Sequence, residues 1–194
     1  PYIQTTIDYD FSQKLKNILN EEFNPAHPDA VWCSDITYIC IFEGFVYLTS
    51  VMDLYSRKII SWVLSETLEA SHVVECVEKA NVSEMLKNVD LPLRQRMPVR
   101  MEAFQKATKG MIHSYSKKAY PWDNACIESF HALLKREWIN RFKIFNYAHK
   151  LIFEYIETFY NTVRIHSHCG YLSPNEYEEQ YLENIEENAV KIAS

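Results

Sequence analysis

Two carboxylates in the 194-residue sequence have types and surroundings that could do chemistry. The first, Asp35, lies in the middle of a run over 31–39 that is rich in strand-forming Val, Ile, Thr, Tyr and Trp. An ionised carboxylate inside a sheet is costly unless a cation or another partner compensates it. The alternative is an aspartate at a strand edge, bonded to a neighbouring backbone amide. Both interpretations of Asp35 fit the local sequence.

The second carboxylate is Glu128, one turn into a long helix that we predict from Asp123 or Asn124 to about Trp138. Asn124 and Glu128 are four residues apart and share a helix face, from which Glu128 could meet Asp35 across the sheet. Converging carboxylates suit hard cations such as Mg²⁺, which take oxygen ligands and keep some of their water. Two such ions about 4 Å apart can activate a water or a 3′-hydroxyl for in-line phosphoryl displacement.

Other polar residues are interpreted as structural. Asp53 ends a predicted strand, where it could pair with Arg57 or cap the turn. The histidines lack a recurring ligand spacing, which favours surface or helix positions over a metal cluster; those weighed are His113, His131, His149, His166 and His168. Three aromatic residues at helical spacing, Tyr155, Phe159 and Tyr160, predict core packing.

The elements that must position Asp35 and Glu128 follow from the hydrophobic pattern. Three runs over 31–64 predict three consecutive antiparallel strands. Helical periodicity follows over 69–80, whereas 81–101 shows neither a strand nor a helix pattern. Further along, the sequence predicts a helix over 102–109, a strand over 111–115, a helix over 147–164 and a last helix from near Asn175. In the 123–138 helix, we expect Ala125, Ile127, Ser129, Ala132 and Leu133 to face partly inward. The order predicts an α/β domain.

Composition bounds the class of protein. The chain is 47% hydrophobic and can bury one substantial core. Its apolar runs are too short to cross a membrane, and no signal peptide is evident. Five scattered cysteines without a Cys-x-x-Cys pair argue against a disulfide framework and a zinc knuckle, so we expect a cytoplasmic setting. The net charge of −6 argues against a dedicated DNA-binding module, although local contact stays open.

We predict three segments. Residues 1–28 form a linker or helical remnant, 29–178 the folded core that carries both candidate carboxylates, and 179–194 an acidic C-terminal tail. The first residue is Pro1 rather than Met, which suggests that residues are missing upstream.

Several ordered motifs resemble one known family. They are Asp35-Ile36-Thr37-Tyr38, the run 47–62, Asp123-Asn124-Ala125 with Glu128-Ser129-Phe130, and Tyr160-Asn161 with Arg164, His166, Gly170-Tyr171 and Pro174. These resemble the integrase core of bacterial insertion-sequence transposases, which are kin to retroviral integrases. The resemblance implies a ribonuclease-H-like fold, a mixed sheet with three antiparallel strands first. It also implies a DDE triad with Asp35 as first acid and Glu128 as last, both as catalytic residues and metal ligands for Mg²⁺ or Mn²⁺.

The second acid of that triad is missing. The family places it on a strand, in a motif reading His-Ser-Asp-Arg-Gly-x-Gln-Tyr, and the patternless segment stands in its place. If residues 92–101 were encoded as CCA CTC CGA CAG AGG ATG CCA GTA CGT ATG, reading one base later gives His-Ser-Asp-Arg-Gly-Cys-Gln-Tyr-Val. The Asp then aligns with Arg94. We hypothesise two compensating frame changes, one between 80 and 91 and one near Met101. Asp90 is a poor substitute at a shifted position.

The resemblance implies a transposase core that joins the element's 3′ ends to target DNA, inactive here because the second Asp is absent. Expected partners are DNA, both element ends and target, and further copies of the chain when DNA is bound, with no membrane. Candidate nucleic-acid contacts are Lys117, Lys118, Asn124 and Arg164, the last also a candidate structural residue. The alternatives are a ribonuclease-H-like nuclease and a non-catalytic remnant that binds DNA or an intact transposase. The upstream helix-turn-helix of such transposases is not found in this sequence.

Overall fold

A five-stranded mixed sheet forms the centre of the computed structural model, which describes residues 23–42, 44–83, 90–93, 101–115, 124–139 and 145–193. The strand order is β3-β2-β1-β4-β5. As predicted, β1 (Trp32–Ile41), β2 (Gly44–Asp53) and β3 (Ile59–Ser65) come first and are antiparallel. β4 (Asp90–Leu93) and β5 (Ile112–Tyr115) are parallel to β1. The predicted fold class, a ribonuclease-H-like α/β fold, is confirmed.

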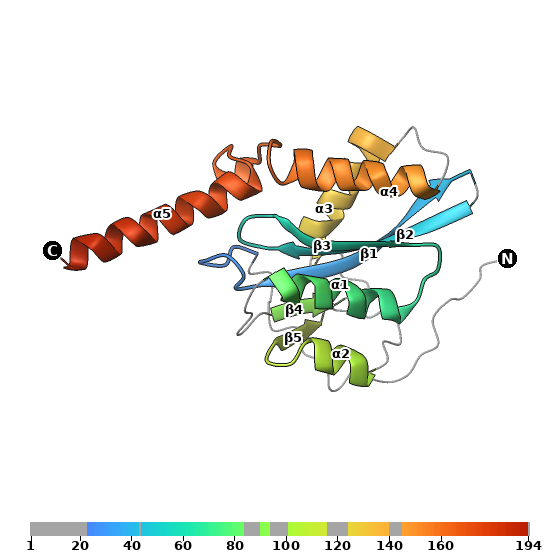
Figure 1. Ribbon diagram of the computed structural model, residues 1–194, viewed down its shortest axis with the longest axis horizontal. Coiled ribbons are helices and arrows are strands. Elements are labelled where there is room, and N and C mark those ends of the chain that lie inside the picture. The colour runs from blue at the N-terminus through green and yellow to red at the C-terminus, as the bar shows by residue number, and fades with distance from the viewer. Residues whose placement is uncertain are drawn as a thin grey trace.

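Helices cover both faces of the sheet (Figure 1). On one face lie α1 (Ala70–Ser83) and α2 (Met101–Ala107). On the other lie α3 (Ala125–Leu134) with its π-helical extension η2 (Lys135–Ile139), and α4 (Phe145–Phe153) with the π-helical η3 (Glu154–Tyr160). The short helix η4 (Ser167–Cys169) leads to α5 (Pro174–Ala193).

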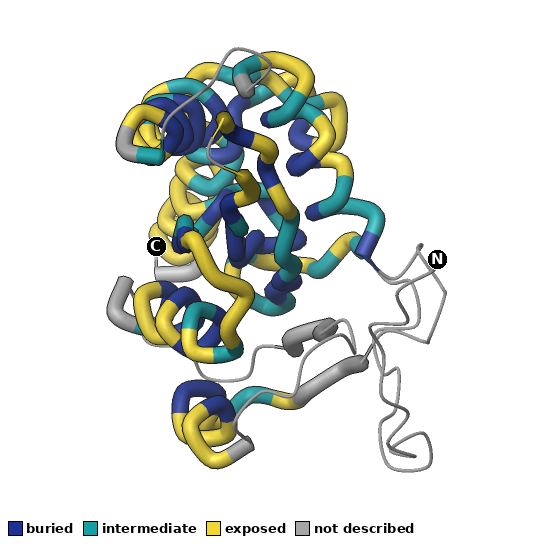
Figure 2. The backbone as a smooth tube through the Cα atoms, turned by 90° about the vertical axis from the view of Figure 1, so that its right-hand side faces the viewer, coloured by how far each residue is buried: buried dark blue, intermediate teal, exposed yellow. Residues whose placement is uncertain are grey.

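Alternation along the strands divides the core into two layers. In β1, Cys33, Ile39 and Ile41 pack toward α3 and α4, whereas Trp32 packs toward α1. Successive strand residues point to opposite faces, so this alternation places Asp35 and Thr37 on the α3 side. In Figure 2 the buried segments lie along the central strands and the exposed ones on the outer sides of the helices. Tyr155 and Tyr160 are buried in the α3 layer and Phe159 packs against it, which confirms the core role predicted for them.

Two features differ from the sequence-based prediction. The segment 81–101, for which we predicted neither strand nor helix, contains β4, because backbone pairing with β1 and β5 supplies what the side-chain pattern lacks. The buried residues of α3 are Ile127, Phe130, His131 and Leu134. Of the expected set, Ile127 is buried and Ala125 and Leu133 are partly buried, whereas Ser129 and Ala132 are exposed. The sequence fixes the helical period, but the sheet decides which side of the helix is covered.

The residues predicted as an acidic tail, 179–194, continue α5 as far as Ala193. The first turns of α5 are anchored by Tyr177, which stacks on Tyr55 with ring centroids 4.8 Å apart. From Leu182 to Lys191 every residue of α5 is exposed, and Figure 1 shows this part of the helix extending away from the sheet. In the part of the chain that the structure describes, no helix combines the length and the apolar character needed to span a bilayer.

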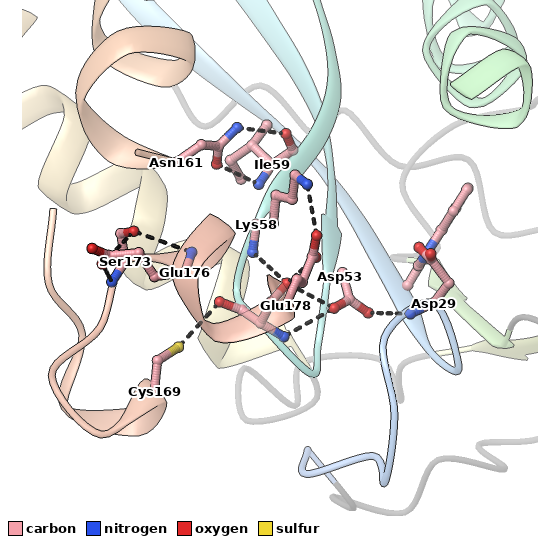
Figure 3. Close-up of polar contacts among 11 residues, drawn as sticks. Asp29, Asp53, Lys58, Ile59, Asn161, Cys169, Ser173, Glu176 and Glu178 are labelled. Atoms are coloured by element: carbon pink, nitrogen blue, oxygen red, sulfur yellow. Dashed lines mark hydrogen bonds and ion pairs between the residues drawn. The ribbon is translucent and has the colours of Figure 1, made fainter. Parts of the chain in front are cut away.

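Asp53 closes the turn after β2, and Ser56 and Lys58 of that turn bind Glu178 of α5 (Figure 3). Its Oδ2 accepts hydrogen bonds from Ser56 N at 2.9 Å and Ser56 Oγ at 2.8 Å, and its Oδ1 accepts one from Asp29 N at 3.1 Å. The predicted turn cap is therefore present. The Arg57 guanidinium instead donates to Phe23 O and to Asn24 Oδ1. Burial raises the pKa of Asp53 to about 6.

Because the pKa of Asp53 is raised on folding, its stabilising contribution is present at pH 4 and declines as the pH rises through 6. We expect Asp53→Asn to be less stable than wild type at pH 4, since its amide nitrogen would face the Asp29 N–H. The gap should shrink by up to about 3 kcal/mol by pH 7. Urea unfolding at four pH values checks this, with Glu183→Gln on the exposed part of α5 as the control. A gap that widens with pH would contradict the prediction.

Candidate functional site

A polar stripe on α3 and η2 faces β1. Its members are Asn124, Glu128, His131 and Lys135, spaced so that they follow one side of the helix. Three of them contact β1 in the order in which they occur along the helix. Asn124 Nδ2 donates to Ser34 O at 3.4 Å, and His131 Nδ1 lies 3.8 Å from Asp35 Oδ2. Lys135 Nζ donates to Thr37 Oγ1 at 2.7 Å.

Glu128 stands between Asn124 and His131 on this stripe, so it lies on the side of α3 that faces Ser34 and Asp35 of β1. Its Oε1 is buried, and the Asp35 side chain is only 13% exposed. The fold therefore places the two sequence-distant carboxylates on facing elements, Asp35 on β1 and Glu128 on the covered side of α3.

An imidazole lies beside the first carboxylate. Ser50 is the cross-strand partner of Asp35, and Ser50 Oγ lies 3.2 Å from Nε2 of His131, whose Nδ1 faces Asp35. Burial, and after it the charge of Lys135, lowers the pKa of His131 to about 3, so the ring is neutral near pH 7. A neutral ring can donate from one nitrogen and accept at the other, which suits its position between a carboxylate and a hydroxyl group.

His131 and Lys135 were not among the predicted site residues. The prediction placed His131 at a surface or helix position; it is on a helix but is 4% exposed. The available signal was spacing, because His131 and Lys135 follow Glu128 at three and seven residues, on the same helix face.

β4 ends beside the same site. Leu93, its last residue, pairs with Ser34, the residue before Asp35. Arg94, the position expected to carry the second acid, lies outside the described residues, as do Lys117 and Lys118. Pro92 stands in a strand with a neighbour on each side, although proline cannot donate to the ladder and is normally confined to edge strands. The local sequence thus conflicts with the strand that it occupies.

Few of the described side chains at this site could bind a metal ion. Among the described residues, no group of three or more His, Cys, Asp or Glu side chains is arranged to hold a metal ion. Asp35 and Glu128 provide two carboxylates, and Mg²⁺ is commonly held by one or two carboxylates with water or substrate phosphate completing its shell. The donor set therefore fits one hard cation and lacks a third carboxylate for a second.

The two remaining candidates for nucleic-acid contact are engaged inside the protein. Asn124 is 1% exposed and holds α3 to β1. Arg164 donates to both oxygens of Glu137, from Nε at 3.1 Å and from Nη2 at 2.9 Å, and Tyr155 Oη also donates to Glu137. These contacts give Arg164 a structural role, and contact with nucleic acid stays a prediction for both residues.

A double-mutant cycle tests the role of Arg164. We expect Arg164→Ala and Glu137→Ala each to destabilise the chain, and the double variant to lose about 1 kcal/mol less than the sum, because one charge-assisted pair is counted twice. Urea unfolding of the four proteins measures this coupling. Additive losses would show that the pair contributes nothing, and a DNA affinity lowered by Arg164→Ala but not by Glu137→Ala would indicate a nucleic-acid contact.

Comparisons with known proteins match this chain to integrase core domains and to insertion-sequence transposases. Two models described as Integrase core domain match residues 25–86 and 109–174. The transposase for insertion sequence element IS904 of Lactococcus lactis is 37% identical over 171 residues, covering 84% of this chain and 66% of that protein. Transposase InsF for insertion sequence IS3fB of Escherichia coli is 34% identical over 172 residues, covering 86% and 60%. The chain thus spans about 60 to 66% of the length of these transposases.

Solved structures show the same fold at low sequence identity. The integrase catalytic core domain of HTLV-2 in complex with magnesium, in its dimeric form, has a TM-score of 0.55 at 13% identity and covers 79% of this chain and 98% of that one. A chain of the simian T-cell lymphotropic virus intasome has a TM-score of 0.61 at 14% identity, covering 80% and 56%.

Proposed function

Because this chain belongs to the integrase core family of insertion-sequence transposases, we propose that it is a DNA strand-transfer core whose catalytic site lacks one carboxylate. The intact reaction joins the 3′ ends of an element to target DNA by metal-dependent transesterification. The observation that supports the proposal is the polar stripe of α3, in which Glu128 lies between Asn124 and His131, the residues that contact Ser34 and Asp35 of β1.

In the proposed site Asp35 and Glu128 hold Mg²⁺ or Mn²⁺. When bound, such an ion supplies a Lewis acid for the phosphate and a more acidic water or 3′-hydroxyl. The chain's own residues orient this site: Asn124 fixes the start of α3 on β1, and Ser50 with the neutral His131 packs beside Asp35. Groups that orient metal-ligating carboxylates commonly affect metal affinity or activity by about 10- to 100-fold.

The proposed defect lies at the end of β4. Arg94 in place of the second acid removes a negative ligand and adds a positive charge, so the affinity for a second cation should fall steeply. Three observations support a shifted reading frame: the pairing of Leu93 with Ser34, Pro92 in an inner strand, and the gap between the two family matches over 87–108. Inspection of the gene tests it, since codons that cannot yield His-Ser-Asp in the shifted frame exclude the hypothesis.

The proposed partners are DNA, both element ends and target, and further copies of this chain assembled on it. Two related integrases are described in an intasome and as a dimer. Lys117 and Lys118 are proposed to contact phosphates near Glu128, with Asn124 and Arg164 as the remaining candidates.

Strand transfer by the 194-residue chain is the direct test. With a labelled duplex and plasmid target in Mn²⁺ or Mg²⁺, we expect no turnover above that of Asp35→Asn, together with weak Mn²⁺ binding by titration calorimetry that Asp35→Asn abolishes. Robust turnover by the wild-type chain would overturn the proposed defect. Binding of Mn²⁺ that is unchanged in both Asp35→Asn and Glu128→Gln would overturn the proposed site.

A further inference from the structure

Two exposed aromatic rings meet on the β1–β2 hairpin, a short distance along β1 from Asp35. Tyr38 is 61% exposed and Phe45 is 55% exposed, and their rings are in edge-to-face contact with centroids 5.6 Å apart. Tyr38 pairs across the strands with Tyr47, and Phe45 with Cys40, so both rings lie on the same face of the hairpin. We call Tyr38 and Phe45 the hairpin aromatic pair.

Lys135 links this pair to the proposed catalytic site. Its ammonium group lies 4.6 Å from the centroid of the Tyr38 ring and donates to Thr37 Oγ1 at 2.7 Å. It belongs to the same polar stripe as Glu128 and His131. The ammonium group has three donors and one is used by Thr37, so it can also bind a phosphate oxygen.

The distances match the repeat of a nucleic-acid strand. Tyr38 follows Asp35 by three residues, which in a β-strand is about 10 Å. That is about three steps of one strand of B-form DNA at 3.4 Å per step. Asp35 and Tyr38 leave β1 on opposite faces because they are an odd number of positions apart. Lys135 connects the two faces, since it contacts Thr37 on the Asp35 side and also the Tyr38 ring. A strand whose phosphate lies at Asp35 can therefore present to Tyr38 a nucleotide that passes Lys135 around the flank of β1.

Among the described residues, none pairs with β1 at Tyr38 on the side away from β2. In the described part of the chain, β4 pairs with β1 only through Ser34, so β1 beyond that level is not covered by a neighbouring strand on this side. The high exposed fraction of Tyr38 also shows that Lys135 covers only part of its ring. Bases stack on such rings regardless of sequence, and adjacent cations neutralise the backbone.

We propose that the hairpin aromatic pair and Lys135 form a stacking subsite for an unpaired base of the DNA strand whose phosphate lies at Asp35 and Glu128. This rests on the proposed function. The ammonium group of Lys135 beside the rings favours a polyanionic DNA strand over an apolar protein partner. A protein surface that bound here would need a carboxylate opposite Lys135 as well as an apolar contact with the rings. The subsite recognises the unpaired state of the base rather than its identity.

The test compares two DNA ligands without chemistry. In EDTA, the 194-residue chain is titrated with a blunt duplex and with the same duplex carrying a three-nucleotide 3′ overhang that contains 2-aminopurine. Fluorescence anisotropy gives the affinity, and quenching of 2-aminopurine reports stacking. We expect Tyr38→Ala and Phe45→Ala each to weaken binding of the overhang duplex by about 5- to 150-fold. Blunt-duplex affinity should stay unchanged and the quenching should be lost.

Matched variants keep the test interpretable. Tyr38→Phe retains the ring and should keep wild-type affinity and quenching, whereas Tyr171→Ala removes an aromatic residue that is 70% exposed elsewhere and should change nothing. Lys135→Gln should weaken both ligands and lower the salt dependence by about one charge. Urea unfolding of each variant confirms that it is folded.

The outcomes separate the two proposals. If wild type binds neither DNA, the proposed function fails. If wild type binds both and Tyr38→Ala weakens them equally or not at all, the stacking subsite is wrong while the proposed function stands. A Tyr38→Ala variant whose sedimentation changes while its overhang binding does not would identify the pair as a contact between protein chains and overturn the subsite.

Discussion

Replacing residues 92–100 by His-Ser-Asp-Arg-Gly-Cys-Gln-Tyr-Val is expected to make the chain bind divalent cations more tightly and transfer DNA strands. The exchange puts Asp at position 94, directly after position 93, where the backbone of Leu93 in the present chain pairs with Ser34 beside Asp35. A third carboxylate there completes the oxygen ligands that two-metal phosphoryl transfer requires. Since loss of an outer-shell group costs about 10- to 100-fold, gain of a direct ligand should raise Mn²⁺ affinity and strand transfer by at least about 100-fold.

The matched control carries the same nine-residue exchange with Asn at position 94. It has the same backbone and the same size of side chain but no added charge, so it should remain inactive. Adding Glu128→Gln to the Asp-containing chain should abolish the gained activity. If the Asn and Asp versions transfer strands equally well, the carboxylate at position 94 is not the missing element. If neither is active although both are folded, a second defect lies elsewhere, and the proposed single cause is wrong.

Asn161→Ala is expected to lower the free energy of unfolding by about 2 to 6 kcal/mol. Asn161 is 4% exposed; its Oδ1 accepts a hydrogen bond from Ile59 N and its Nδ2 donates to Ile59 O, both at 3.0 Å. Ile59 begins β3, the edge strand, so Asn161 satisfies backbone groups that no further strand can pair. Removing the amide leaves a buried donor and a buried acceptor without partners, at about 1 to 3 kcal/mol each.

The neighbouring substitution Thr162→Ala provides the control for this prediction. Thr162 is exposed, and its hydroxyl donates to Thr158 O, four residues earlier in the chain. Its loss should be within about 0.5 kcal/mol, as for other surface changes. Urea unfolding followed by circular dichroism measures both variants. A loss for Asn161→Ala no greater than that for Thr162→Ala would mean that water replaces the two bonds without cost.

Much of the fold could be predicted from the pattern of side chains. The three strands over 31–64 could be predicted because β-branched and aromatic residues alternate between turns. The helix α1 could be predicted because apolar residues recur at helical spacing. β4 was not legible. Its four residues include Pro92, and its place in the sheet depends on backbone pairing with β1 and β5, which are distant in sequence. Pairing between distant strands leaves no local periodic signal.

The candidate site, like the fold, could be predicted from the sequence only in part. The sequence by itself was enough to select Asp35 and Glu128 as candidate site residues and to show that the expected motif lacks a third acid. Both conclusions depend on residue identity and motif order, which are local properties. Only the tertiary structure decided that α3 turns Glu128, His131 and Lys135 toward β1, since the covered side of a helix depends on the sheet beneath it. The same packing buried Asn124 against Ser34 and paired Arg164 with Glu137. Both were candidates for nucleic-acid contact, and Arg164 was also a candidate structural residue.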